Sequence, residues 1–266
     1  MTETSEAEVR IEPVSSLEHM QRCVDLQVAI WGYADGDVIP RRVFVVAQRI
    51  GGQVLGAFDG ETMVGFAMGL PGYRAGAAYL HSHMLAVLPE YRNAGLGRRL
   101  KLAQREDAME RGFDLMEWTF DPLDIKNAYL NLGRLGAIAR RYEPDFYGAS
   151  SSPLQGGLPT DRLYAEWWLR SERVSKRLAE GVDENAQDAE VVERVHVPAG
   201  VDRWKADPQQ RQRALDLQMR NREAFQSAFG RGLAAIGYER DAAGDGSFLL
   251  GLPTGIPMSG RLGAPR

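Results

Sequence analysis

The segment whose residue types and spacing predict chemistry is Arg92-Asn93-Ala94-Gly95-Leu96-Gly97, an R-x-x-G-x-G pattern. Its two glycines carry no Cβ atoms that would keep an anion away from the main chain. A helix expected to begin there leaves the N–H groups of its first turn without partners, and its peptide dipoles favour negative charge. Arg92, Arg98 and Arg99 add positive side chains. The pattern therefore predicts a site for a pyrophosphate.

Other glycine-rich loops match the pattern less well. A Walker loop requires Lys and then Ser or Thr after its last glycine, whereas Arg98 and Arg99 follow Gly97. A dinucleotide fingerprint shares the first two glycines, but Leu100 occupies its third position. Glu117 lies in the middle of an expected strand, not at its end, where a ribose-binding acid belongs. Nicotinamide binding and a ligand-free tight turn stay open as alternatives.

With its flanks, Tyr79 to Gly112, the loop resembles motif A of the GNAT superfamily of acetyl-CoA-dependent N-acyltransferases. The match runs through Leu85, Val87, Pro89-Glu90-Tyr91-Arg92, Gly95 and Gly97, and a weaker resemblance extends from about Val9 to Tyr147. In this family the loop amides hold the pyrophosphate of acetyl-CoA. The resemblance implies that the cofactor contacts Leu85, Ala86, Val87, Arg92, Asn93, Ala94, Gly95, Leu96, Gly97, Arg98 and Asn127.

The resemblance includes one departure. Asn127-Ala128 and Leu135-Gly136 look like the later Asn-containing helix of the family and its Leu-Gly ending. However, Leu132 stands where the family often has a Tyr that protonates the departing thiolate. Tyr142 or Tyr147 could act in its place, unless no protein acid is needed.

Acyl transfer to an amine requires a base, because an ammonium acceptor must lose a proton before it attacks. His83 is the first candidate, since its strand parity with Leu85 and Val87 predicts that it faces the acyl site. In the family, a main-chain N–H of that strand polarises the thioester carbonyl, and residues 85–87 supply this edge. His81 has the same parity, one step further away. A hydrogen-bonded strand histidine is the ordinary alternative for both.

Carboxylates offer a second route for the proton. Glu117 and Asp121 share strand parity, and Asp121 is expected at the strand end, just before Pro122. Asp121 could accept a proton, bind a cationic acceptor, or cap a helix that starts near Asp124. The catalytic candidates are therefore His83, Asp121 and Tyr142. The sequence contains no C-x-x-C or H-x-x-x-H pattern, so we expect no metal.

Composition favours a soluble enzyme. The 266 residues are 44% hydrophobic and 26% charged, with a net charge of −4 and 32 basic residues scattered among 36 acidic ones, which argues against nucleic-acid binding. No apolar stretch approaches the roughly 18 residues of a membrane span. One cysteine, Cys23, and an acidic N-terminus without an apolar segment predict a reducing, cytoplasmic location.

Local signals predict the elements around the loop. A strand over 9–13 precedes a helix capped by Ser15 or Ser16, whose buried stripe is expected at Leu17, Met20, Val24 and Val28. A second helix runs from Pro40 to the glycines at 51–52. Asp59-Gly60 joins strands 53–58 and 62–70 in a hairpin. Next come a strand over 78–88, the helix over 96–111 and a strand over 113–120. They are followed by a helix with Ile125, Ala128 and Leu135 on its apolar face and by a strand over 161–170.

These observations predict an α/β (α+β) fold with a mixed, mainly antiparallel sheet flanked by helices. We expect a GNAT-like acetyl-CoA-binding domain over residues 1–148, a loop, sheet-completing strand and linker over 149–190, and a smaller C-terminal α+β region over 191–266. That region could extend the sheet, shape the acceptor pocket or pair two copies into a homodimer. The expected function is transfer of an acetyl or short acyl group from acyl-CoA to a small-molecule amine. The alternative is a catalytically degenerate CoA-binding sensor or interaction protein.

Overall fold

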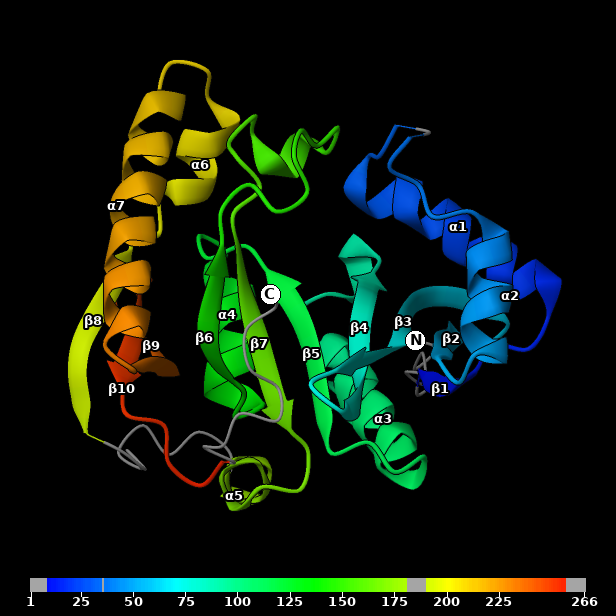
Figure 1. Ribbon diagram of the computed structural model, residues 1–266. Helices are drawn as coiled ribbons and strands as arrows, with labels where there is room; N and C mark the ends of the chain where they lie inside the picture. The colour runs from blue at the N-terminus through cyan, green and yellow to red at the C-terminus, as the bar shows by residue number, and fades with distance from the viewer. Residues whose placement is uncertain (1–8, 35, 181–189, 257–266) are drawn as a thin grey trace, which may run out of the picture. The chain divides into compact units, whose positions relative to one another are not determined.

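A computed structural model describes residues 9–34, 36–180 and 190–256 of the chain. The chain divides into two compact units, Met1–Phe113 and Asp114–Arg266, and each is described by itself (Figure 1). This division falls elsewhere than the boundaries expected at 148 and 190. It groups elements by contact and does not test which residues form a functional domain, so the expected boundaries stay a prediction.

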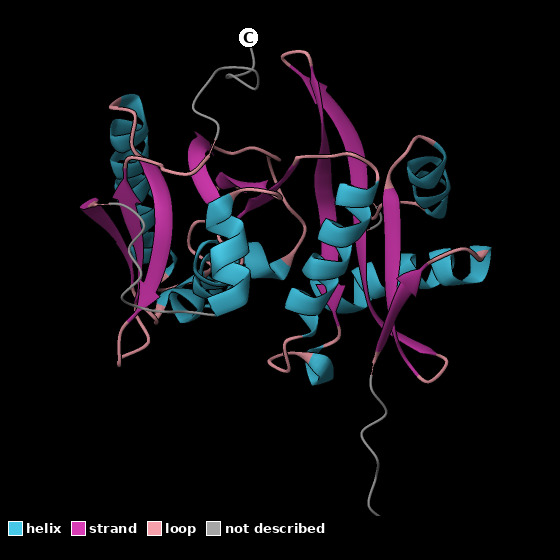
Figure 2. Cartoon of the chain, turned by 90° about the horizontal axis from the view of Figure 1, so that it is seen from below, coloured by secondary structure: helices cyan, strands magenta, loops and turns pink. Residues whose placement is uncertain are grey.

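The first unit is an antiparallel sheet with helices on both faces (Figures 1 and 2). Its strands lie in the order β1 (Arg10–Pro13), β2 (Gln53–Asp59), β3 (Thr62–Arg74) and β4 (Ala77–Val87). One face packs against α1 (Leu17–Trp31) and α2 (Arg41–Arg49) through Met20, Phe44, Phe66 and Met84. The other packs against α3 (Leu96–Glu110) through Leu55, Val87, Leu96 and Leu100. The sheet thus has an α1/α2 face and an α3 face.

The expected start of α1 is confirmed, but its expected buried stripe is confirmed only in part: Met20 is buried and Val24 packs against the core, whereas Leu17 and Val28 are exposed. The hydroxyl of Ser16 accepts a hydrogen bond from the amide of His19, as an N-cap does. Leu17 and Val28 are 58% and 49% exposed, whereas Gln27 is buried. The reason is a tertiary contact: the Gln27 amide bonds both the N–H and the carbonyl of Ile39. This contact fixes which face of the helix turns inward, and Cys23 and Leu26 lie on it.

The expected hairpin between β2 and β3 is confirmed, with Gly60 at a φ of 57° in the turn. The strand and helix that flank the loop are confirmed as β4 and α3.

The second unit contains six strands in the order β5 (Leu115–Phe120), β7 (Arg162–Trp168), β6 (Ile138–Glu143), β9 (Ala234–Arg240), β10 (Gly246–Gly251) and β8 (Val191–Val197). Its helical segments are α4 (Ile125–Ala128), a π-helical stretch (Tyr129–Arg134), a 3₁₀ turn (Pro153–Gln155), α5 (Glu172–Glu180), α6 (Val201–Ala206) and α7 (Arg211–Gly230). Every strand pair described within a unit is antiparallel. The expected α/β (α+β) class with a mainly antiparallel sheet is confirmed.

The C-terminal strands extend the sheet of the second unit, because β9 pairs with β6 through Ala139 and Ala235. A hairpin at Asp245-Gly246 joins β9 to β10. Local signals in the sequence did not indicate β6 or α5. Most of the expected linker, 181–189, lies outside the described residues.

Among the described residues, the structure contains no helix that combines the length and the apolar character needed to cross a membrane.

Candidate functional site

The R-x-x-G-x-G loop is held in place on both sides. A 3₁₀ turn over Pro89–Tyr91 follows β4, and the Tyr91 hydroxyl donates to Asp59 at 2.6 Å. Nε of Arg92 donates to the carbonyl of Val87 at 3.0 Å, which ties the loop to the end of β4. Asn93 and Gly95 adopt left-handed conformations, with φ of 66° and 78°, so the chain reverses before α3 begins. Contacts within the protein therefore hold the loop in a defined conformation.

The first turn of α3 presents unpaired amides. The first bond of the helix runs from the Arg99 amide to the Gly95 carbonyl. Within the described part of the chain, the amides of Leu96, Gly97 and Arg98 donate to no other residue. The Arg92 amide differs, because it donates to the carbonyl of Pro89 and is not available. The amides of residues 96–98, at the helical end of the loop, are thus available as donors.

Gly97 has no role in packing that would explain a glycine. A Cβ built there would meet only Cδ2 of Leu85, at 3.7 Å, which is ordinary van der Waals contact. Its φ lies outside the left-handed region. Because glycine destabilises a helix by about 1 kcal/mol relative to alanine, the fold alone does not account for this residue. The open space in front of the amides suits close approach of an anion.

A bulge in β4 overturns the expected facing of His83. Met68 pairs with Met84 and Gly69 pairs with Ser82, which leaves His83 as an extra residue. Ser82 and Leu85 consequently point to the same α3 face, as the bond from Lys101 to Ser82 and the packing of Leu85 show.

The expected parity of His83 with Leu85 and Val87 is therefore wrong. The extra residue lies on the side of His81 and Met84, and the two imidazole rings are 6.0 Å apart. Burial lowers the pKa of His83, so its neutral, proton-accepting form is favoured. Its catalytic role stays a prediction.

Asp121 is bound by the protein itself. Its Oδ1 accepts from the Leu123 amide and its Oδ2 from Nζ of Lys205, each at 2.8 Å. The helix cap is Asp124, which accepts from the amide of Asn127 at 3.0 Å and from its side chain at 2.8 Å. Lys205 lies on α6, and no local signal in the sequence points to it. The catalytic role of Asp121 and the cofactor contact of Asn127 stay predictions.

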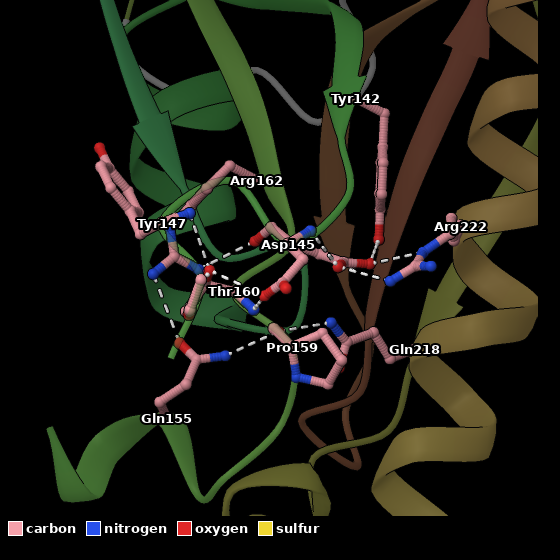
Figure 3. Close-up of polar contacts among 11 residues, drawn as sticks. Tyr142, Asp145, Tyr147, Gln155, Pro159, Thr160, Arg162, Gln218 and Arg222 are labelled. Atoms are coloured by element: carbon pink, nitrogen blue, oxygen red, sulfur yellow. Dashed lines mark hydrogen bonds and ion pairs between the residues drawn. The ribbon is translucent and has the colours of Figure 1, made fainter. Parts of the chain in front are cut away.

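Tyr142 belongs to a buried network that fastens α7 to the sheet (Figure 3). Its hydroxyl donates to Asp161 at 2.5 Å, and Arg222 binds the same carboxylate through two nitrogens at 2.7 and 2.9 Å. Burial, and then the bond to Asp161, raise the pKa of Tyr142. Burial alone would raise the pKa of Asp161, but the bonds from Arg222 and Tyr142 hold it below its usual value. The proton of Tyr142 is firmly held, and its role as an acid stays a prediction.

Neither Leu132 nor Tyr147 offers an unengaged hydroxyl in place of Tyr142. Leu132, at the usual Tyr position, is fully buried in the π-helical stretch. The Tyr147 hydroxyl shares a hydrogen bond with Thr119 at 2.9 Å.

Sequence reasoning missed a cluster of two arginines and two glutamates on β5, β6 and β7. The register between β6 and β7 shifts so that Arg140 and Arg141 together oppose Tyr164. Arg141 binds the buried Glu117 at 2.6 Å, and Arg140 binds Glu166 at 2.9 Å. Glu117 is thus an ion-pair partner within this sheet. The strands that carry the two glutamates were predicted from the sequence, but β6, which carries the two arginines, was not.

No group of three or more His, Cys, Asp or Glu side chains that could hold a metal ion occurs among the described residues.

Comparison with known proteins gives the family of the loop-bearing segment. The family model described as acetyltransferase (GNAT) family matches residues 21–130. No curated protein matches the chain.

Three solved structures illustrate the similarity. Aminoglycoside 6'-acetyltransferase type Ii is 18% identical, with 60% of this chain and 97% of that chain covered and a TM-score of 0.48. The ribosomal-protein-S18-alanine N-acetyltransferase of Escherichia coli is 14% identical, with 59% and 92% covered and a TM-score of 0.47. The yncA acetyltransferase of Salmonella typhimurium, solved with its cofactor acetyl-CoA, is 17% identical, with 61% and 94% covered and a TM-score of 0.49. The match of the family model alone relates residues 21–130, which include the R-x-x-G-x-G loop, to the acetyltransferase (GNAT) family.

Proposed function

We propose that this protein transfers an acetyl or short acyl group from acyl-CoA to the amine of a small molecule. The observation that carries the proposal is the pair of features at the start of α3: unpaired amides at residues 96–98, and a glycine at 97 that the fold does not require. Both fit the pyrophosphate of coenzyme A, which needs several N–H donors and close approach to the main chain. The family of the segment supports the same assignment.

In the proposed reaction, residues of the first unit bind the cofactor, polarise the thioester carbonyl and remove the proton of the acceptor. The amides of Leu96, Gly97 and Arg98 bind the pyrophosphate. The main chain of β4 over Leu85, Ala86 and Val87 donates to the thioester carbonyl, on which negative charge develops. His83, whose neutral form burial favours, would take the proton from the acceptor ammonium through water, because the bulge turns its side chain away from the face of Leu85 and Val87. Bound acyl-CoA supplies the thioester that the amine attacks.

The proposed residues of the second unit have weaker support. Asn127 would contact the cofactor arm, but its side chain is bonded to Asp124. Asp121 would accept a proton or bind a cationic acceptor, but Lys205 already neutralises it. Tyr142 would protonate the thiolate only if Asp161 released its hydroxyl. In the proposed leaving step the thiolate of CoA therefore takes its proton from water, and a loss of turnover in variants of these residues would assign that proton to one of them instead.

The test is acyl-CoA binding together with thiol release. Titration calorimetry should detect acetyl-CoA and no NAD, and thiol release should continue steadily when a panel of small amines is supplied. NAD binding without acetyl-CoA binding would overturn the proposal in favour of a dinucleotide site.

A CoA-binding sensor without catalysis is the second candidate. It is favoured by the full burial of Leu132 at the usual Tyr position and by the engagement of Tyr142 with Asp161. Tight acetyl-CoA binding with no thiol release for any amine would support the sensor over the enzyme. A cytoplasmic location and a homodimer stay predictions from the sequence.

A further inference from the structure

A lysine lies in the interior of the first unit, between α3 and β4. Lys101 is 4% exposed, and its Nζ donates to the hydroxyl of Ser82 at 2.7 Å. The Ser82 hydroxyl in turn donates to Oε1 of Gln104 at 2.8 Å. Gln104 and Ser82 are buried as well, at 0% and 4% exposure. Two side chains of α3 therefore hold one hydroxyl of β4.

The same network reaches the second strand of the sheet. Nε2 of Gln53 on β2 donates to the main-chain carbonyl of Gln104 at 3.2 Å and to Asp107 at 2.5 Å. Oε1 of Gln53 and Nε2 of Gln104 are buried without a partner among the described residues.

Placing an ammonium group in this interior carries a desolvation cost. Burial holds the pKa of Lys101 well below its usual value, because an ammonium in the interior loses its hydration. An apolar side chain of the same length would fill the space without that cost. Elsewhere the α3 face is packed with ordinary apolar residues such as Leu55, Val64 and Leu100. A polar group kept at such a place calls for a role other than stability.

The position of Ser82 suggests the role. Ser82 is the last regularly paired residue of β4 before the bulge at His83. The strand edge over residues 85–87 follows the bulge directly. The helix α3, which carries Lys101 and Gln104, begins with the loop amides. The bonds from Lys101 and Gln104 thus connect the helix that carries the anion site to the strand that carries the bulge.

We propose that Lys101 is a positioning residue: by fixing Ser82 it holds the β4 bulge, and with it His83 and the 85–87 edge, at a constant distance from the amides of α3. The inference rests on the proposed acyl transfer, in which these two parts bind the thioester and the pyrophosphate of the same molecule. A displacement of about 1 Å between such groups can lower turnover by about a hundredfold.

The experiment replaces Lys101→Met, which keeps the length of the side chain and removes its donor. We expect a folded protein with a melting temperature equal to or above that of the wild type, an acetyl-CoA dissociation constant within about twofold, and a turnover number about tenfold or more lower. Amide hydrogen exchange at residues 83–87 should be faster in the variant. Ser82→Ala should show the same pattern, and the double variant should lose no more turnover than either single variant, because the two groups act as a unit.

The control is Val14→Ala, which weakens the packing of the α1/α2 face and lies outside the α3 face. It should lower the melting temperature and leave turnover unchanged. Unchanged turnover and exchange in Lys101→Met, or equal losses of affinity and turnover, would overturn the positioning role. If wild-type protein neither binds acetyl-CoA nor releases thiol, the proposed function fails. Hydrogen exchange at the bulge then still decides whether Lys101 holds β4.

Discussion

Replacement of Gly97 separates a residue kept for the fold from one kept for a ligand. A Cβ at this position meets only Leu85, at 3.7 Å, and its φ is acceptable for any residue. Gly97→Ala should therefore leave stability unchanged or raise it by up to about 1 kcal/mol, the difference in helix propensity. Gly97→Val should gain less, because its branched side chain loses rotamers in a helix.

The effect on cofactor affinity should have the opposite sign. A side chain at residue 97 keeps the phosphate from the helical amides, and loss of one charge-assisted hydrogen bond costs about 1.5–3 kcal/mol. The dissociation constant of acetyl-CoA should then rise about tenfold to a hundredfold. The larger Val should cause a greater rise than Ala.

Titration calorimetry with two ligands measures this effect, while thermal melting gives the stability. Acetyl-pantetheine lacks the pyrophosphate, so its affinity should be the same for the wild type and both variants. Gly112→Ala is the matched control at the other end of α3. With a φ of +84° and open space around it, it should cost about 1 kcal/mol of stability and leave affinity unchanged. A folded Gly97→Val protein that binds acetyl-CoA as the wild type does would refute the assignment of the loop.

Three further changes test other parts of the structure. His83→Ala should leave acetyl-CoA affinity unchanged and reduce turnover. Because burial lowers the pKa of His83 from its ordinary value of 6.5, the turnover of the wild type should fall only below pH 6.5. If the variant keeps the pH profile of the wild type, another group is the base. Arg222→Leu leaves the buried Asp161 carboxylate without its cation and should lower the free energy of unfolding by about 3–5 kcal/mol in urea melts, whereas a loss below about 1 kcal/mol would contradict a structural pair. Leu132→Tyr restores the usual family residue at a fully buried position; it should cost about 1–3 kcal/mol by overpacking, and any gain in turnover would show that a hydroxyl can reach the leaving group from there.

The pH dependence of stability gives a separate test of Lys101. Its folded pKa lies below that of the unfolded chain, so between the two values the unfolded state binds more protons and stability rises with pH. The advantage of Lys101→Met over the wild type should thus shrink as the pH rises toward about 10.4, the value of an exposed lysine. Chemical unfolding at pH 7 and pH 10 measures this difference. An advantage that does not change with pH would show that the lysine is not desolvated.

The sequence by itself determined the loop, the strand and helix around it, and the hairpin at Asp59-Gly60. These features depend on neighbours in the chain: glycine relieves a positive φ in the turn, and helical or alternating spacing places apolar residues on one face. The family resemblance can be recognised in the sequence because the residues of its motif lie in one continuous segment.

Only the tertiary structure decided which polar side chains are engaged and which way they face. The bulge at His83 reverses the strand parity, and a single extra residue in one strand has no reliable signature in sequence. Asp121 meets Lys205 across 84 residues of sequence, and Asp161 meets Arg222 across 61. Such pairs form because the sheet and its helices bring distant segments together, and burial then makes each unpaired partner costly. The spacing of these residues in the sequence does not predict that they lie close together in the fold.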